Sequence, residues 1–232
     1  MEGVTLNKIA YDLLLTVRGG VLSDDDSIDL RQIKFWINNQ RAFIIKNSLK
    51  GREISANVIQ DLGCVELEAA DPAECCGYSS GCTILRTKLE IPTPVKLVGT
   101  DAITHIGPTD KIDIPFEYVT YNRALYSGNG AFNGNLIYAF MLNNRIYLKM
   151  KGQGLMYTAM KYINIQGVFQ NPEDIQDFTY CGGDACYTDD TNYPVDSSMV
   201  TQIKELVLAK DLRIISTAPK DISNDANDDA KQ

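Results

Sequence analysis

The stretch KIAYDLLLTVRGGVLSDDDSIDLRQIKFWINNQRA, Lys8 to Ala42, has the pattern of two amphipathic helices separated by a glycine break and an acidic cap. Apolar residues recur at three- and four-residue spacing through its first part, and Gly19-Gly20 end that pattern, as expected where an amphipathic helix stops. Residues 23–27, SDDDS, then offer short acceptors and negative charge to the unpaired amides at the start of a helix. The sequence therefore predicts a second helix from near Ile28.

This second helix has an apolar surface wider than packing on one side requires. The surface consists of Leu30, Ile33, Trp36, Ile37, Phe43, Ile44 and Ile45. We expect the Trp36 face and the acidic cap at Asp24 to Asp26 to be structural rather than catalytic. An element beyond the first helix must cover this face.

Short strand-like runs replace the helical period between Leu62 and Cys186, and each ends at Gly, Pro, Asn or Asp. The candidate strands are Cys64 to Glu68, Thr83 to Ile91, Val95 to Val98, Phe116 to Tyr121, Leu136 to Leu142, Arg145 to Met150 and Tyr162 to Val168. Asn143-Asn144 separates two of these runs, and asparagine tolerates the positive φ of a two-residue hairpin loop. The sequence thus predicts a β-rich region with a tight turn at these asparagines.

A helical period returns after Pro194, with Met199 and Ile203 on its apolar face and Asp196 among the residues that can cap its start. From Thr217 the chain becomes polar, with four Asp and a single large apolar residue, Ile222. Such a segment cannot bury enough surface to offset its ordering entropy. We expect it to be disordered in the free protein.

These patterns predict an α+β fold in which an N-terminal helical hairpin packs with a C-terminal helix, with a β-rich insertion between them and a disordered acidic C-terminal tail. The predicted units are a helical hairpin at 1–61, a β-rich region at 62–193, a C-terminal helix at 194–216 that completes the helical unit, and a flexible tail at 217–232. The C-terminal helix would cover the second face of the Trp36 helix.

Composition disfavours several classes of function. Apolar residues form 44% and charged residues 22% of the chain, which is ordinary for a folded globular protein. No run approaches the roughly twenty apolar residues that cross a bilayer, and we expect a protein made and kept in a cytoplasm. The 30 acidic and 22 basic residues give a net charge of −8, which disfavours general nucleic-acid binding but is compatible with the wall of a DNA channel.

The opening stretch, with QDLGCVEL at Gln60 to Leu67 and INIQGVF at Ile163 to Phe169, resembles the neck structural proteins of crAss-like gut bacteriophages. More loosely, a helical pair of this kind is similar to the head-to-tail adaptor rings that tailed phages attach beneath the portal. The first resemblance covers most of the chain and implies a virion structural protein without catalytic residues. It also implies a ring of identical subunits, twelvefold where it meets a twelvefold portal.

On this resemblance we expect the partners to be further copies of the chain, the portal protein and the next ring protein of the neck or tail. Packaged DNA would pass through the channel without specific recognition, and no membrane partner is expected. Closed head-to-tail contacts between identical subunits generate such a ring. For portal docking we favour the C-terminal helix and tail, since a disordered segment can fold onto a large partner surface.

Six cysteines leave several alternatives open. They lie at Cys64, in the group Cys75, Cys76 and Cys82, and in the group Cys181 and Cys186. Two glycine-flanked turns that offer thiolates could meet as a tetrahedral zinc site, but neither has the two-residue spacing of a zinc knuckle. Reduced thiols are the expectation in a reducing cytoplasm, and a disulfide formed after lysis is an alternative.

His105 is the only histidine, so any acid–base relay would have to be built around it. No serine or cysteine motif accompanies it, and we expect a histidine at a strand end with satisfied hydrogen bonds. Gly128, Gly130 and Gly134 lack the Gly-Lys-Ser/Thr ending of a phosphate loop, and a hairpin tip explains them better. Asp24 to Asp26 lack the ligand spacing of a calcium loop.

The 12 tyrosines include several in the β-rich region, namely Tyr118, Tyr121, Tyr126, Tyr138 and Tyr147. Tyrosine is favoured both in β cores and at subunit interfaces, and the sequence does not divide them. We predict no catalytic, cofactor-binding or metal-ligating residue and no cofactor. The alternatives are a metal-dependent binding module or enzyme built on the cysteine loops and His105, and a capsid-surface or tail-fibre accessory protein.

Overall fold

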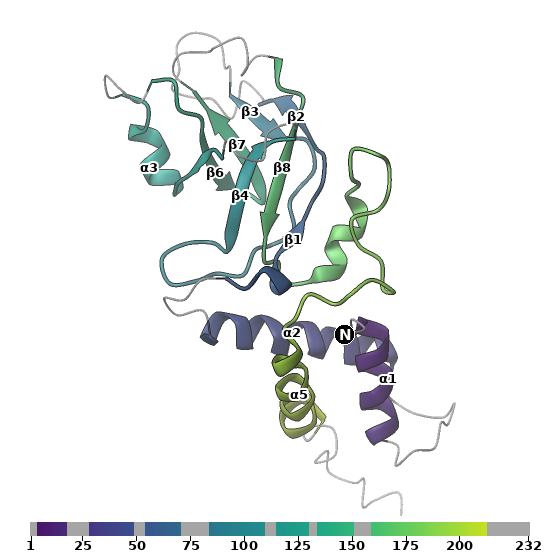
Figure 1. Ribbon diagram of the computed structural model, residues 1–232. Helices are drawn as coiled ribbons and strands as arrows, with labels where there is room; N and C mark the ends of the chain where they lie inside the picture. Colours follow the sequence, from purple (N-terminus) through teal and green to yellow (C-terminus); the bar gives the residue numbers. More distant parts are fainter. Residues whose placement is uncertain are drawn as a thin grey trace, which may run out of the picture.

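The computed structural model describes residues 4–17, 28–48, 54–70, 84–109, 115–129, 134–150 and 159–212. A curled sheet forms one part of the molecule and a group of helices forms the other (Figure 1). Within these residues, no helix has both the length and the apolar character that crossing a membrane demands.

Eight strands form the sheet. They are β1 (Gln60–Asp61), β2 (Val65–Ala69), β3 (Leu85–Thr87), β4 (Ile103–Pro108), β5 (Glu117–Tyr118), β6 (Tyr138–Leu142), β7 (Arg145–Lys149) and β8 (Tyr162–Gly167). Their order is β1-β8-β2-β3-β7-β6-β5, and β4 also pairs with β8. All pairings are antiparallel except that of β5 with β6. β8 therefore pairs with three strands, β1, β2 and β4.

The sheet curls into a half-barrel around an apolar interior (Figure 1). Ile163 and Ile165 alternate with less buried residues along β8, as expected for a strand with one face in a core. The backbone amide of Phe116 donates to the carbonyl oxygen of Ile106 at 2.6 Å. This bond connects the start of β5 to β4 and narrows the open side of the curled sheet.

A second apolar core lies among the helices. The helical segments are α1 (Leu6–Val17), α2 (Leu30–Ser48), α3 (Tyr121–Tyr126), α5 (Ser197–Leu206) with its π-helical extension η4 (Val207–Leu212), and the 3-10 turns η1 (Ala56–Val58) and η3 (Pro172–Asp177). α1 and α5 both contact α2, and both cross it in Figure 1. Trp36 is half-buried against this core, in agreement with a structural role for its face.

The predicted fold class is wrong. It described an N-terminal helical hairpin packed with a C-terminal helix and interrupted by a β-rich insertion. Instead, the curled eight-strand sheet organises the molecule, and the helices are few and mostly short. α1 and α2 also cross each other rather than running side by side as a hairpin (Figure 1). Helical periodicity indicates which face of a helix is buried, but it does not indicate the direction or size of the element that buries it.

The turn predicted at Asn143-Asn144 is confirmed. The two asparagines have φ values of 50° and 56°, and Leu142 pairs with Arg145 across the two-residue loop. The strands predicted at 64–68, 136–142, 145–150 and 162–168 correspond to β2, β6, β7 and β8, with bounds that differ by no more than two residues. Alternating apolar residues with clear turn signals therefore predict strands well in this chain.

β1, β4 and α3 are not predicted by the sequence patterns. Only β3 forms within the strand predicted at 83–91, and the strand predicted at 116–121 contains β5 but runs into α3. Residues 95–98 form one arm of an irregular hairpin rather than a regular strand. In β4, Gly107 and Pro108 resemble chain breakers, and the pairing with β8 overrides that local signal.

The helix predicted after Pro194 is confirmed as α5, with Met199 and Ile203 buried. Asp196 occupies the N-cap position, but its carboxylate accepts hydrogen bonds from Ser55 Oγ at 3.1 Å and Asn57 Nδ2 at 2.9 Å instead of capping the helix. The start of α5 is thereby attached to the turn that precedes β1. The cap predicted at Asp24 to Asp26 and the tail predicted at 217–232 lie outside the described residues.

Candidate assembly surfaces

Arg41 joins the helices to the sheet from inside the protein. Buried residues that repeat every four positions along α2 are Ile33, Ile37, Arg41 and Ile45, so the arginine occupies a core position. Its guanidinium donates to the carbonyl oxygens of Pro194 at 2.8 Å, Phe169 at 2.8 Å and Val58 at 3.4 Å. One side chain thus holds three separate segments against α2.

Burial shifts the pKa values of Arg41 and Tyr193, which meet where the helices contact the sheet. Desolvation lowers the pKa of Arg41, and its three hydrogen bonds go to neutral carbonyls rather than to a carboxylate. The Tyr193 ring lies 5.7 Å from its Cζ, and the Tyr193 hydroxyl donates to Asn38 Oδ1 at 2.7 Å. Burial raises the pKa of Tyr193, so this hydroxyl stays protonated. The contacts form a buried polar network that fixes the helices relative to the sheet.

Two acidic residues, Glu173 and Asp189, lie close to Lys34 of α2. Lys34 Nζ contacts Asp189 Oδ2 at 2.6 Å. Burial, followed by the charge of Asp189, raises the pKa of Glu173, whereas Lys34 lowers it. Within the described ranges, Glu173 Oε1 is buried without a hydrogen-bond partner. The junction between α2 and η3 therefore contains a carboxyl group whose pKa lies above its ordinary value.

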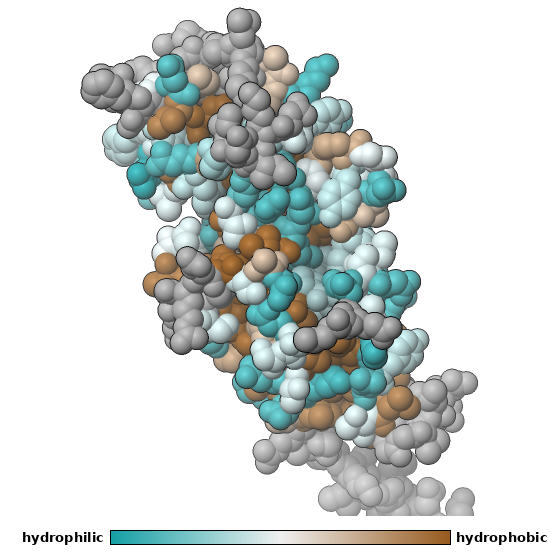
Figure 2. All heavy atoms as spheres, in the orientation of Figure 1, coloured by the Kyte–Doolittle hydropathy of each residue, from teal (hydrophilic) through white to brown (hydrophobic). Residues whose placement is uncertain are grey.

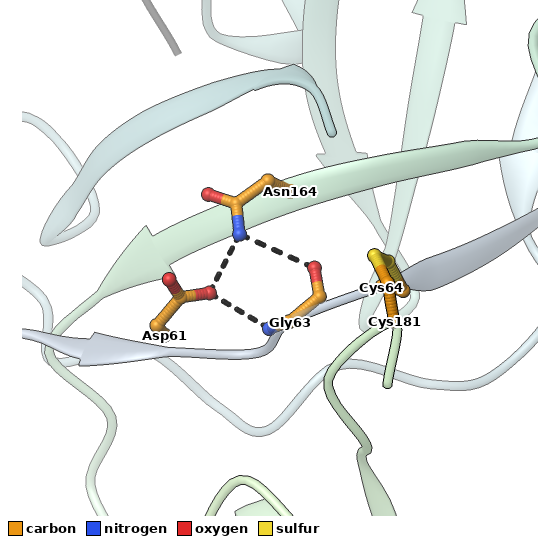
Figure 3. The surroundings of a disulfide bond; sticks show 5 residues. All are labelled: Asp61, Gly63, Cys64, Asn164 and Cys181. Atoms are coloured by element: carbon orange, nitrogen blue, oxygen red, sulfur yellow. Dashed lines mark hydrogen bonds between the residues drawn. A yellow bond between two sulfur atoms is a disulfide. The ribbon is translucent and has the colours of Figure 1, made fainter. Parts of the chain in front are cut away.

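Cys64 and Cys181 form a disulfide between the residue before β2 and the loop after η3 (Figure 3). Their Cα atoms are 5.1 Å apart, within the range that such bonds span. The bond encloses a sequence separation of 117 residues, so spacing along the chain does not indicate this pair. It ties an exposed loop to the sheet.

Asp61 and Gly63 shape the chain beside the disulfide (Figure 3). Asp61 Oδ1 accepts hydrogen bonds from the backbone N of Gly63 and from Nδ2 of Asn164, both at 2.7 Å, and Gln166 Nε2 donates to the other oxygen at 3.2 Å. Gly63 has a φ of 65°, and a Cβ at this position would lie 2.6 Å from the carbonyl oxygen of Thr179. Only glycine fits there.

Cys186 carries a free thiol. Burial, followed by the charge of Asp61, raises the pKa of Cys186 to about 11, so the thiol is protonated near neutral pH and weakly nucleophilic. Cys75, Cys76 and Cys82 lie outside the described residues. Among the residues that are described, no group of three His, Cys, Asp or Glu side chains could hold a metal ion.

His105 lies within β4, where the pairing with β8 shifts register, and not at a strand end. Its Nε2 is buried and has no hydrogen-bond partner in the described part of the chain, so the expectation of satisfied hydrogen bonds is wrong. Gly128 follows α3 with a φ of 83°, and its segment leads from a helix to β6. Gly130 lies outside the described residues, but the element before Gly128 is a helix and not a strand, so the expectation of a hairpin tip is also wrong.

The structure divides the tyrosines between core and surface. Tyr138 and Tyr147 are buried, and Tyr118 is half-buried and donates to Asp101 Oδ2 at 2.7 Å. Tyr121 and Tyr126 on α3 are exposed. The surface apolar side chains on and after α3 are Tyr121, Leu125, Tyr126 and Leu136. Helix α3 is thus one candidate contact surface.

A hairpin over residues 95–102, which we call the 95–102 hairpin, projects from the base of the sheet. Its base is held by a hydrogen bond from the Val95 amide to the Val168 carbonyl at 2.8 Å, and its tip by one from the Leu97 amide to the Thr100 carbonyl at 2.9 Å. Val98 at the tip is 83% exposed, more than any other large apolar residue of the described segments. Figure 2 shows apolar side chains at the level where the sheet meets the helices.

A groove of about 850 Å³ lies between β1, the start of α5 and the segment that connects η3 to α5. Gln60, Asp61, Cys186 and Tyr187 are among its lining residues. Gln60 is 9% exposed and Tyr187 is 4% exposed. Neither Gln60 Oε1 nor Tyr187 Oη has a hydrogen-bond partner among the residues the structure describes. The groove therefore has a large volume, and two of its lining residues carry buried polar atoms without partners among the described residues.

Comparison with known proteins identifies the family. The model of the family described as phage tail ring protein 2 matches residues 8–230. The chain belongs to this family. This ring protein is also similar to Ring protein 2 of Bacteroides phage crAss001, with 24% identity over 233 residues that cover 97% of this chain and 98% of the relative. The predicted relationship to crAss-like phage ring proteins is confirmed, and the ring protein is a structural component of the virion.

The sequence indicates some of the contact regions of this ring protein and not others. Arg41 occupies a position at which the buried repeat of α2 otherwise has isoleucine. This charged residue in an apolar repeat is the sequence signal for the contact between α2 and the sheet. The adjacent Val98 and Gly99 indicate an exposed turn, but nothing in the sequence shows how far it projects. The groove has no sequence signal, because β1 and the segment before α5 are more than one hundred residues apart and meet only in the fold.

Proposed function

We propose that this ring protein is a structural subunit of the phage neck, where a ring below the portal joins head to tail and continues the DNA channel. The match of the ring protein family to residues 8–230 carries the proposal, because it covers the helices and the sheet together. Its role is geometric rather than enzymatic. Each subunit would contact its neighbour through two unlike surfaces, and repetition of that contact closes a ring.

The charge of the chain supports passage of DNA through such a ring. The net charge of −8 gives a repulsive field toward a phosphate backbone, and a repulsive wall favours free passage over binding. Packaged DNA would therefore pass without specific recognition. We propose twelve copies, by analogy with a twelvefold portal.

The proposed neighbours are the portal protein and the next ring of the neck or tail. For portal docking we favour α5 and the C-terminal tail at 217–232, because the tail is strongly polar and a segment of this composition can fold onto a large partner surface. The sheet would then contact the next ring or peripheral proteins. These assignments give each part of the chain a testable position in the particle.

Electron microscopy of purified protein and of intact particles tests this proposal. We expect concentration-dependent rings with twelve subunits, and density for the curled sheet and the crossed helices below the portal of the particle. A protein that stays monomeric at high concentration and has no density in the neck would overturn the proposal. Stoichiometric zinc, with loss of fold on chelation, would support a metal-dependent module instead.

A further inference from the structure

We propose that neighbouring copies of this protein contact each other by insertion of the 95–102 hairpin of one copy into the groove beside β1 of the next. The inference rests on the proposed ring function and names the surfaces that build the ring. The occupant of the groove is a second copy of this chain, and the contacting element is the hairpin tip.

The hairpin has the features of an inserted element. Val98 is 83% exposed at its tip, and the backbone amides of Val98 and Gly99 donate no hydrogen bond among the described residues. Lys96 is exposed at the base of the tip, and the described part of the chain provides no acidic partner for its ammonium group. The tip thus offers an apolar side chain, free amide donors and an unpaired positive charge.

The groove offers the complementary groups. Gln60 and Tyr187 line the groove, and their polar atoms Oε1 and Oη are buried behind its surface without a hydrogen-bond partner among the described residues. Burial of polar groups without partners is unfavourable, so a small shift of these two side chains toward an occupant that supplies partners would be favoured. A volume of about 850 Å³ is sufficient for several side chains.

Charge gives the contact a direction. Asp61 lines the groove, and its carboxylate is held only by the neutral donors Gly63, Asn164 and Gln166. Lys96 approaches with the opposite charge when the tip enters the groove. Complementary charge at the two surfaces favours this orientation of the hairpin in the groove.

The positions of the two surfaces suit a ring. In Figure 1 the loop that leads into β4 projects to the left, and the green segment between η3 and α5 lies to the right, both at the level where the sheet meets the helices. Two unlike surfaces on opposite sides of one subunit form a heterologous contact, which generates rings or filaments rather than closed dimers. The hairpin and the segment that lines the groove lie on different sides in this view, as such a contact requires.

The native thiol of Cys186 in the groove allows a direct test. We expect Val98→Cys to form intermolecular disulfides with Cys186 under mild oxidation, which non-reducing gels show as a ladder of oligomers. The control Val98→Cys with Cys186→Ser should remove that ladder, and peptide mapping should identify the linkage between residues 98 and 186. Rings of the Val98→Cys protein without this linkage would overturn the inference and leave the proposed ring function intact.

A second variant measures how much the contact contributes to assembly. Val98→Asp should raise the concentration needed for ring formation at least tenfold and leave the melting temperature of the monomer unchanged, because Val98 is exposed. Leu89→Asp is the matched control, since Leu89 is 49% exposed and lies outside both the hairpin and the groove. Equal assembly of Val98→Asp and wild type would refute the inference. Absence of rings from the wild-type protein would refute the proposed function as well.

Discussion

Arg41 is stable in the protein interior because carbonyl oxygens of three separate segments accept its N–H groups. Hydrogen bonds to a charged group are stronger than those between neutral groups, and a buried carbonyl left without its donor is destabilising. At the residue scale, the connection between helices and sheet therefore depends on this guanidinium more than on any one apolar contact.

Arg41→Ala should lower the free energy of unfolding by about 3 kcal/mol or more, because it leaves three buried carbonyls unpaired and opens a cavity. Arg41→Lys should fall between this variant and wild type, since an ammonium cannot reach all three oxygens. Urea denaturation followed by circular dichroism measures both. Arg31→Ala on the exposed face of α2 is the control, and a loss of the same size there would contradict the explanation.

The disulfide makes stability depend on redox conditions. Cys181→Ser should lower the free energy of unfolding by about 2–4 kcal/mol, because the bond restricts a long loop of the unfolded chain. Reductant should lower the melting temperature of wild type and have little effect on Cys181→Ser, whereas Cys186→Ser should respond like wild type. We expect chelators and Cys181→Ser to leave assembly intact. Insensitivity of wild type to reductant would show that this bond does not contribute.

Glu173 gives stability a pH dependence. Its pKa in the folded protein is raised, by burial first and then by Asp189, while Asp174 adds to the effect and Lys34 opposes it. The stabilising contribution is therefore complete below the unfolded pKa and is lost as pH rises through the folded pKa. Glu173→Gln should raise the melting temperature near neutral pH and give no advantage at about pH 4. Glu205→Gln, on the exposed surface of α5, is the control, and a gain in melting temperature of the same size there would count against this explanation.

Among elements, the hairpin of β6 and β7 depends on two asparagines with positive φ. Asn144→Ala should lower the free energy of unfolding by about 1 kcal/mol, because an alanine side chain crowds its own backbone in this conformation. Asn144→Gly should be close to neutral, since glycine adopts this φ freely. Thermal unfolding of the two variants measures the difference, and equal melting temperatures would mean that the turn relaxes to another conformation.

The same hairpin shows why some elements could be predicted and others could not. β6, β7 and β8 combine alternating burial with strong turn signals, so local sequence determines them. β1 has only two residues, and β4 ends in Gly107 and Pro108, so both depend on β8 for their pairing. α3 is a six-residue helix that follows directly after β5, too short for a periodic pattern. Elements that form only through contacts with a distant segment show little signal in their own sequence.

The division of the chain at residues 61, 193 and 216 stays a prediction, and the tail provides a test at the level of the whole molecule. Truncation after Ser216 should leave the fold and the melting temperature nearly unchanged, because residues 217–232 have a single large apolar side chain with which to form a core. It should weaken attachment to portal-bearing heads. Co-sedimentation with heads measures this effect. If the truncated protein attaches as well as the full chain, the helices are the better candidates for docking.

The fold class was predicted wrongly because contacts between distant parts of the chain decide it. The wide apolar face of α2 correctly indicates that more than one element covers it, and α1 and α5 both do so. Yet burial of Arg41 against Val58, Phe169 and Pro194 means that the sheet side of the molecule contributes to the same contact. The sequence shows that Arg41 interrupts an apolar repeat, but the three carbonyls that receive it come together only in the folded chain.

The hydrogen bond from the Phe116 amide to the Ile106 carbonyl oxygen limits how the sheet can pair with other chains. An exposed strand edge is a template for further strands, and open edges lead identical chains into fibres. In this protein β5 has only two residues, and the backbone beside it is already bonded to β4. The β5 side of the sheet is therefore a poor template for further strands, so copies of the chain are not led into fibres through this edge and remain available for contacts of defined geometry.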